Sequence, residues 1–83
     1  MYQIVFSRIA EKDLEKVNKK YKPHIIAVLF DLRKDPYLGK KLAGKFCDCY
    51  SMRIGMYRIV YKIYKNKLNI LIIRIGPRQG VYK

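Results

Sequence analysis

The spacing of hydrophobic positions changes its period once along this chain. From residue 8 to about residue 34, apolar side chains recur every three or four positions, which is the period of an amphipathic helix. From residue 49 to residue 75 they recur at every second position, which is the period of a β-strand. The pattern therefore predicts a domain whose helices precede most of its strands.

Two helices are predicted after a short opening strand with the sequence YQIVF. Ser7 can begin the first helix, which we expect to run to about Lys20, and Pro23 suits the first turn of the second. Asp35-Pro36 should end that second helix. The apolar stripe predicted for the first helix is Ile9, Ala10, Leu14 and Val17; the second has Ile25, Ile26, Leu29, Phe30 and Leu32.

Three strands are predicted in the second half, with the sequences CYSMRI, YRIVYKIY and LNILIIRI. Gly55-Met56 reads as a two-residue hairpin turn with Gly55 at positive φ, and Lys65-Asn66-Lys67 as a second turn with Asn66 left-handed. The order βααβββ predicts an α+β fold in which a helical hairpin packs on one face of a small, mostly antiparallel sheet. We expect residues 1–83 to form a single domain.

The predicted hairpin places Arg53 directly opposite Arg58. Like charges in this position destabilise a sheet, so the pair favours an anionic ligand on that face, and the planar guanidinium suits phosphate. The alternatives are that both side chains extend into solvent or that Asp48 neutralises one of them. The face predicted to lie under the helices contains Tyr50, Met52, Ile54, Tyr57, Ile59, Tyr61 and Ile63; the opposite face contains Ser51, Arg53, Arg58, Val60 and Lys62, joined by Arg74 if its face matches.

Charge strengthens the prediction of a polyanionic partner. The 83 residues include 19 Lys and Arg but 6 Asp and Glu, and Asp48 is the one acid after Asp35. Nucleic acid is the partner that this excess favours, the alternative being a solvated lysine-rich surface. We expect no membrane span and no signal peptide, hence a cytoplasmic location, with Cys47 and Cys49 as free thiols.

The final segment, RIGPRQGVYK, adds Arg78 and Tyr82 after a Gly-Pro turn. Arginines stabilise the charge of a phosphodiester transition state, and a tyrosine in positive surroundings can transfer a proton. If Arg53, Arg58, Arg78 and Tyr82 share one face, they can act on a phosphodiester without a metal or another cofactor. The other interpretation of Tyr82 is an aromatic residue packed on the core.

The βααβββ order, the block LAGKF…CYSMRIGMYRIVYKI and the final RIGPRQGVYK together resemble the RelE/ParE superfamily of type II toxin–antitoxin toxins. The motifs R-x-G-x-YR-x-x-Y and R-x-G-x-R-x-x-x-Y are most similar to the RelE branch. This resemblance implies the microbial RNase fold and a ribosome-dependent mRNA endonuclease that cuts A-site codons by metal-independent attack of the 2′-hydroxyl. Implied partners are mRNA, ribosomal RNA and a cognate antitoxin, which alone brings the toxin to DNA.

By resemblance, Arg58 and Arg78 stabilise phosphate charge, Tyr82 transfers a proton or stacks on a base, and Arg53 replaces the second lysine of a Lys-x-Lys pair. Ser51 departs from the first lysine of that pair, and Pro77 stands where many relatives have a histidine, so the general base is not identified. The residues expected to bind RNA are Lys40, Lys41, Lys45, Ser51 and Arg74.

Three alternatives remain open at this point: a ParE-like inhibitor of DNA gyrase, a non-catalytic RNA-binding domain, and an inactive relative that serves as an antitoxin-binding scaffold. The usual absence of the tail arginine and tyrosine from the ParE branch argues against the first. For an antitoxin helix, we expect exposed apolar surface beside the helices or along the sheet. The sole histidine, His24, should lie on the surface.

Overall fold

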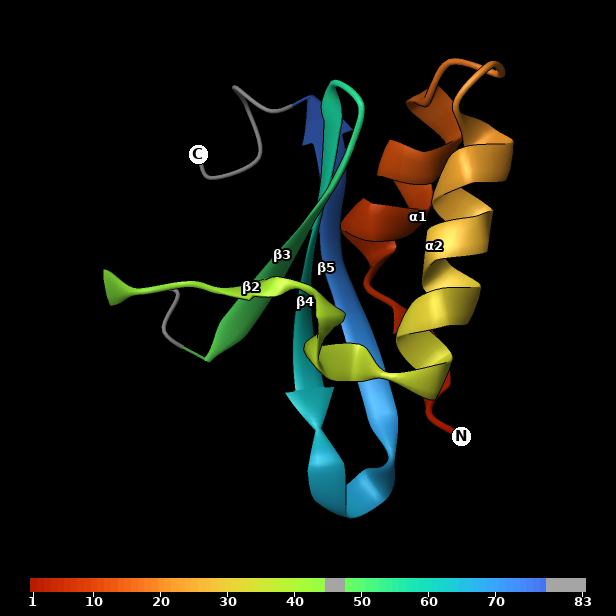
Figure 1. Cartoon of the computed structure of the whole chain (residues 1–83). Coiled ribbons are helices and arrows are strands. Elements are labelled where there is room, and N and C mark those ends of the chain that lie inside the picture. Colours follow the sequence, from red (N-terminus) through yellow and green to blue (C-terminus); the bar gives the residue numbers. More distant parts are fainter. Residues whose placement is uncertain (45–47, 78–83) are drawn as a thin grey trace.

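The computed structural model describes residues 1–44 and 48–77 (Figure 1). Its elements are β1 (Gln3–Phe6), α1 (Arg8–Lys16), α2 (Lys22–Lys34), β2 (Lys40–Lys41), β3 (Cys49–Ile54), β4 (Tyr57–Tyr64) and β5 (Asn69–Pro77). Two 3₁₀ turns among the described residues, η1 (Pro36–Leu38) and η3 (Lys65–Lys67), precede β2 and β5. The predicted α+β class and the order of the longer elements are confirmed.

The described strands form one sheet in the order β1-β5-β4-β3-β2. The β1–β5 pair is parallel and the other three pairs are antiparallel, and both helices cover the same face of the sheet (Figure 1). The short strand β2 was not predicted, because the pattern of its two lysines and their glycine-rich surroundings indicated a loop. Lys40 and Lys41 nevertheless pair with Ser51 and Tyr50 of β3, so β2 extends the sheet by one edge strand.

Helix α1 begins where the sequence predicted and ends one turn earlier. The Ser7 Oγ accepts a hydrogen bond from Ala10 N at 3.0 Å, which is the N-cap geometry, and donates to Ile73 O at 2.9 Å. The helix ends at Lys16 instead of Lys20 because Val17 is extended and buried, at 4% exposure, in the core. Ile9 was predicted on the buried stripe but is 54% exposed, since Ala10 is the side chain that faces the sheet.

Helix α2 divides its apolar side chains between the core and the surface. Ile25, Leu29 and Leu32 are buried at the i, i+4, i+7 spacing of one helix face. Ile26 and Phe30 were predicted on the same apolar side but are 46% and 56% exposed. Each follows a buried residue by one position, and one step rotates a side chain by about 100° around the helix axis, away from the sheet.

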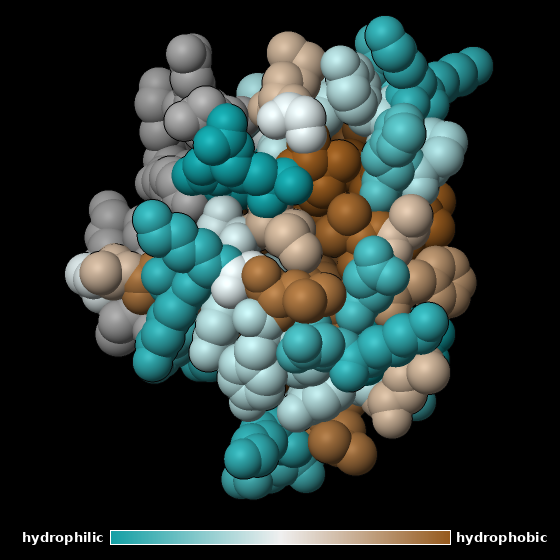
Figure 2. Space-filling model, in the orientation of Figure 1, coloured by the Kyte–Doolittle hydropathy of each residue, from teal (hydrophilic) through white to brown (hydrophobic). Residues whose placement is uncertain are grey.

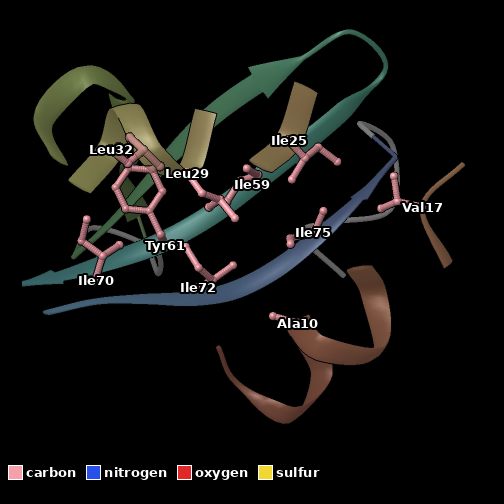
Figure 3. Close-up of a cluster of buried hydrophobic side chains, with 10 residues drawn as sticks. All are labelled: Ala10, Val17, Ile25, Leu29, Leu32, Ile59, Tyr61, Ile70, Ile72 and Ile75. Atoms are coloured by element: carbon pink, nitrogen blue, oxygen red, sulfur yellow. The ribbon is translucent and has the colours of Figure 1, made fainter. Parts of the chain in front are cut away.

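The core is a continuous cluster between the two helices and the sheet (Figure 3). It contains Ala10, Val17, Ile25, Leu29, Leu32, Ile59, Tyr61, Ile70, Ile72 and Ile75. All seven residues predicted to lie under the helices belong to this cluster or pack against it, which confirms the predicted face of the hairpin. Because side chains alternate between the two faces of a strand, the position of the turn decides which residues of the hairpin face the helices.

The turn between β4 and β5 differs from its prediction in one residue. Leu68 has φ of 52° and is the described non-glycine residue with positive φ, whereas the sequence had favoured Asn66. Lys65, Asn66 and Lys67 instead form a 3₁₀ turn, and Leu68 N donates to Lys65 O at 3.3 Å. Reversing the chain after that turn requires the left-handed conformation at the next residue, although leucine adopts it at a cost of roughly 1–2 kcal/mol.

Candidate nucleic-acid site

The β3–β4 hairpin has the predicted register. Ile54 pairs with Tyr57 and Arg53 pairs with Arg58, so the two arginines are direct cross-strand neighbours. Gly55 has φ of 59°, and a Cβ on it would lie 3.2 Å from the Tyr21 ring of the helical hairpin. Glycine is therefore required at this turn by backbone conformation, and the tight space favours it as well.

A pocket of about 380 Å³ lies beside this arginine pair. Its floor comes from β3 and β4, and its wall comes from the segment that leads through η1 into β2. The lining residues are Leu38, Gly39, Lys40, Leu42, Ser51, Met52, Arg53 and Arg58. Four of the predicted site residues, Lys40, Ser51, Arg53 and Arg58, thus lie around one hollow, although they come from three strands.

The side chains of this pocket differ in how far they reach into solvent. Ser51 is buried, Arg58 is half-buried, and Lys40 and Arg53 are exposed. A half-buried guanidinium is more fixed in place than an exposed one and binds an anion in a region of lower dielectric constant. The arrangement can hold a phosphate between Arg58 at the floor and the exposed cations at the rim. Figure 2, in the orientation of Figure 1, shows hydrophilic side chains around the edges of the molecule and hydrophobic ones between them.

Arg74 lies outside this pocket. Its Nε donates to Asp13 Oδ2 of α1 at 2.9 Å, and the same oxygen accepts from Ile75 N at 3.0 Å. The register shifts between Val60 and Tyr61, where β5 carries one extra residue, so the alternation of faces that the sequence suggested breaks before Arg74. The structure does not bring Arg74 to Arg53 and Arg58, and a role for it in RNA binding stays a prediction.

The other predicted residues that the structure describes do not line the arginine pocket. Lys41 is exposed on β2, and His24 is exposed at the start of α2, as expected. Pro77 ends β5 opposite Tyr57. Lys45, Cys47, Arg78 and Tyr82 lie outside the described residues, so the predicted alignment of Tyr82 with Arg58 is not tested. Cys49 is buried against Val60.

Tyr61 and Gly39 are site residues that sequence reasoning missed. The Tyr61 hydroxyl donates to Pro36 O at 2.7 Å and accepts from Gly39 N at 3.0 Å, which joins β4 to the pocket wall. Burial raises the pKa of Tyr61 to about 12, although the hydrogen bond from Gly39 N acts in the opposite direction. A signal was present, because Tyr61 is the last residue of the R-x-G-x-YR-x-x-Y motif and had been assigned only to the core.

The raised pKa predicts a loss of stability in alkali. The folded protein keeps the Tyr61 proton up to about pH 12, whereas an unfolded tyrosine releases it near pH 10, so the free energy of unfolding falls as pH rises between these values. A shift of this size corresponds to about 2–3 kcal/mol. Urea unfolding of the wild type and of Tyr61→Phe between pH 10 and about pH 12 should show a larger fall in the free energy of unfolding for the wild type. If this free energy falls equally with pH in both proteins, the raised pKa does not belong to Tyr61.

The cross-strand arginines predict a second stability effect. Replacing Arg53 with glutamine removes one of the two like charges that pair across the hairpin and should raise the free energy of unfolding by about 0.2–1 kcal/mol at low salt. At 1 M salt the gain should shrink, because charges near the surface are screened within about 3 Å. Urea unfolding at both salt concentrations measures the effect, and a destabilised variant at low salt would show that Arg58 does not repel Arg53.

Neither a metal centre nor a membrane span is found among residues 1–44 and 48–77. No three His, Cys, Asp or Glu side chains in these ranges are grouped so that they can hold a metal ion. None of the described helices has both the length and the apolar character to cross a bilayer.

The structure thus combines an α+β fold, with two helices on one face of a five-stranded sheet, and a basic pocket where the edge strand β2 pairs with β3. A family model described as the ParE toxin of type II toxin–antitoxin systems matches residues 4–82. The chain therefore belongs to this toxin family, within the RelE/ParE superfamily.

Individual relatives include toxins named RelG and RelE. The chain is 29% identical over 84 residues to Toxin RelG of Mycobacterium tuberculosis, covering 99% of this chain and 97% of the relative. It is 30% identical to Toxin RelE of the same organism, covering 99% and 87%. The crystal structure of the toxin–antitoxin complex RelBE2 from that organism superimposes with a TM-score of 0.85 at 29% identity, covering 93% of this chain and 98% of the matched one.

Proposed function

We propose that this toxin is a ribosome-dependent mRNA endonuclease of the RelE type. The observation that carries the proposal is the pocket in which Arg58 and Arg53, neighbours across the hairpin, meet Lys40 from the edge strand. A repulsive pair at this place is explained if the ligand is a polyanion. The similarity to Toxin RelE and Toxin RelG supports the same conclusion.

In the proposed reaction the 2′-hydroxyl oxygen of one nucleotide attacks the adjacent phosphorus. The new P–O bond forms as the bond to the 5′-oxygen breaks, leaving a 2′,3′-cyclic phosphate and a 5′-hydroxyl, and the proton of the 2′-hydroxyl is passed on as the leaving oxygen gains one. Arg58 stabilises the extra negative charge on the phosphate oxygens. Arg78 and Tyr82, which come after β5 in the sequence, are proposed to complete the site.

The test is cleavage of mRNA by the purified protein on stalled ribosomes. Reverse transcription should locate cuts within the codon in the A site, and end analysis should find a cyclic phosphate and a 5′-hydroxyl. Free mRNA serves as the control for ribosome dependence. A correctly folded protein that leaves ribosome-bound mRNA intact would refute the proposal, and salt-sensitive RNA binding without cleavage would then indicate a non-catalytic binding domain.

Inhibition of DNA gyrase is a second candidate function, because the family model that matches the chain is described as ParE toxin. A supercoiling assay with purified gyrase distinguishes the two. Inhibition of supercoiling with intact mRNA would favour the ParE-type function, and the opposite result would favour the endonuclease.

We also propose that a cognate antitoxin covers the apolar groove between α2 and β1. This groove has a volume of about 440 Å³ and is lined by Gln3, Ile4, Phe6, Leu14, Ile26, Leu29, Phe30 and Arg33. The exposed Ile26 and Phe30 agree with the prediction of apolar surface beside the helices. Co-purification with the product of a neighbouring small gene tests this, and Phe30→Glu should abolish the complex if the groove is used. An intact complex would place the antitoxin elsewhere.

A further inference from the structure

Tyr61 occupies an unusual position, because its ring is fully buried while its hydroxyl bonds to backbone from another part of the chain. The hydroxyl donates to Pro36 O at 2.7 Å and accepts from Gly39 N at 3.0 Å. Both of its hydrogen-bonding directions are thus used on the same short segment. Each of these backbone groups would lose its partner if the hydroxyl were removed.

That segment forms the wall of the nucleic-acid pocket. Its shape is held internally, since Asp35 Oδ1 accepts from Tyr37 N at 3.1 Å and Leu38 N donates to Asp35 O at 3.4 Å. Its place against the sheet depends on other contacts: the two-residue pairing of β2, the hydrogen bond from Leu42 N to Cys49 O at 2.9 Å, the Tyr37–Tyr50 ring contact at 5.8 Å, and the Tyr61 hydroxyl. The Tyr61 hydroxyl is the contact that bonds to the segment before β2, at Pro36 and Gly39.

Gly39 shows how closely the wall is fitted. A Cβ at this position would lie 2.9 Å from Ser51 O and would collide with the Tyr61 hydroxyl. Gly39 directly precedes Lys40, which pairs with Ser51 on the pocket floor. The glycine therefore allows the wall to approach the floor, and Tyr61 holds it there.

We propose that Tyr61 is a positioning residue for RNA binding, whose phenol holds the Pro36–Lys41 segment so that Lys40 stands at the rim of the pocket beside Arg53. The proposal rests on the proposed endonuclease function. The phenol itself contacts no substrate and acts through the wall. Arg58 belongs to β4 and keeps its pairing with Arg53 whether or not the wall is held.

Tyr61→Phe is therefore expected to raise KM for ribosome-bound mRNA by about tenfold while kcat changes by less than about threefold, because a rim cation binds ground state and transition state alike. Tyr57→Phe is the matched control. It removes a hydroxyl from the same strand, one that accepts from Asn18 N at 3.2 Å on the helical side. Both variants are compared as folded protein, with the folded fraction measured by circular dichroism.

A readout independent of activity is the hydrogen exchange of the Gly39 amide. In Tyr61→Phe this amide should exchange at least tenfold faster, whereas amides in the β4–β5 pairing should keep their wild-type rates. Tyr57→Phe should leave Gly39 unchanged. If the wild type does not cleave RNA, the endonuclease function fails, but the exchange rates still decide whether Tyr61 holds the wall.

Gly39→Ala provides a second variant should Tyr61→Phe unfold, and the proposal is then overturned if Gly39→Ala leaves KM unchanged. Its methyl group should displace the wall and raise KM as Tyr61→Phe does. The double variant Gly39→Ala/Tyr61→Phe lacks the hydroxyl that collides with the new methyl group. Its increase in KM should therefore be smaller than the product of the increases in the two single variants. The proposal is overturned if the effects multiply fully, or if Tyr61→Phe matches Tyr57→Phe in both KM and Gly39 exchange.

Discussion

Replacing Arg58 with alanine is expected to lower the rate of mRNA cleavage by roughly a hundredfold to a thousandfold, with a smaller change in KM. The half-buried guanidinium lies at the floor of the pocket and is the described group best placed to stabilise charge that grows on the phosphate during the reaction. Single-turnover cleavage of ribosome-bound mRNA measures this effect, since it separates the chemical step from product release.

Two control variants make this result specific. Arg8→Ala removes the same charge from an exposed position at the start of α1 and should cleave like the wild type. Arg58→Lys keeps the charge but loses the planar fork, so its rate should fall between those of the wild type and Arg58→Ala. Equal rates for Arg58→Ala and Arg8→Ala would remove Arg58 from the reaction and leave it a purely structural role.

The second large effect is on stability. Ile25→Ala should lower the free energy of unfolding by about 2–5 kcal/mol. Ile25 is fully buried on the side of α2 that faces the sheet, and the loss of its side chain leaves a cavity. Small domains are stable by about 5–15 kcal/mol in total, so this single change can populate the unfolded state. Urea unfolding followed by circular dichroism at neutral pH measures the loss.

Ile26→Ala is the matched control for Ile25→Ala, because it makes the same substitution one position along the same helix. Ile26 is 46% exposed and should cost about 1 kcal/mol or less. Its larger effect should be on the antitoxin complex, since it lines the proposed groove. Equal losses of stability for the two variants would mean that α2 is rotated relative to the arrangement described above.

The hairpin and its arginine pair could be predicted from sequence because local chemistry determines them. Gly55 sets the turn, the turn sets the register, and the register places Arg53 opposite Arg58. The same local reasoning placed the start of α1 at Ser7 and the end of α2 at Asp35. The exception among these local features is the β4–β5 turn, where Leu68 and not Asn66 takes the left-handed conformation.

Tertiary structure decided the features that depend on distant contacts. The strand β2 exists because Lys40 and Lys41 meet β3, and Arg74 turns away from the pocket because a bulge in β5 brings it to Asp13. Periodicity cannot tell Ile25 from Ile26 at the edge of an apolar face, since the position of the sheet alone separates them.

By itself, then, the sequence determined the α+β class, the order of its longer elements and the cross-strand arginines, because turns, caps and periodicity act over short stretches of chain. Only the tertiary structure revealed the pocket wall and its attachment through Tyr61 to Pro36 and Gly39, 25 and 22 residues earlier in the chain. A hydrogen bond between such distant groups leaves no periodic trace, since it is specified by the packing of the whole domain.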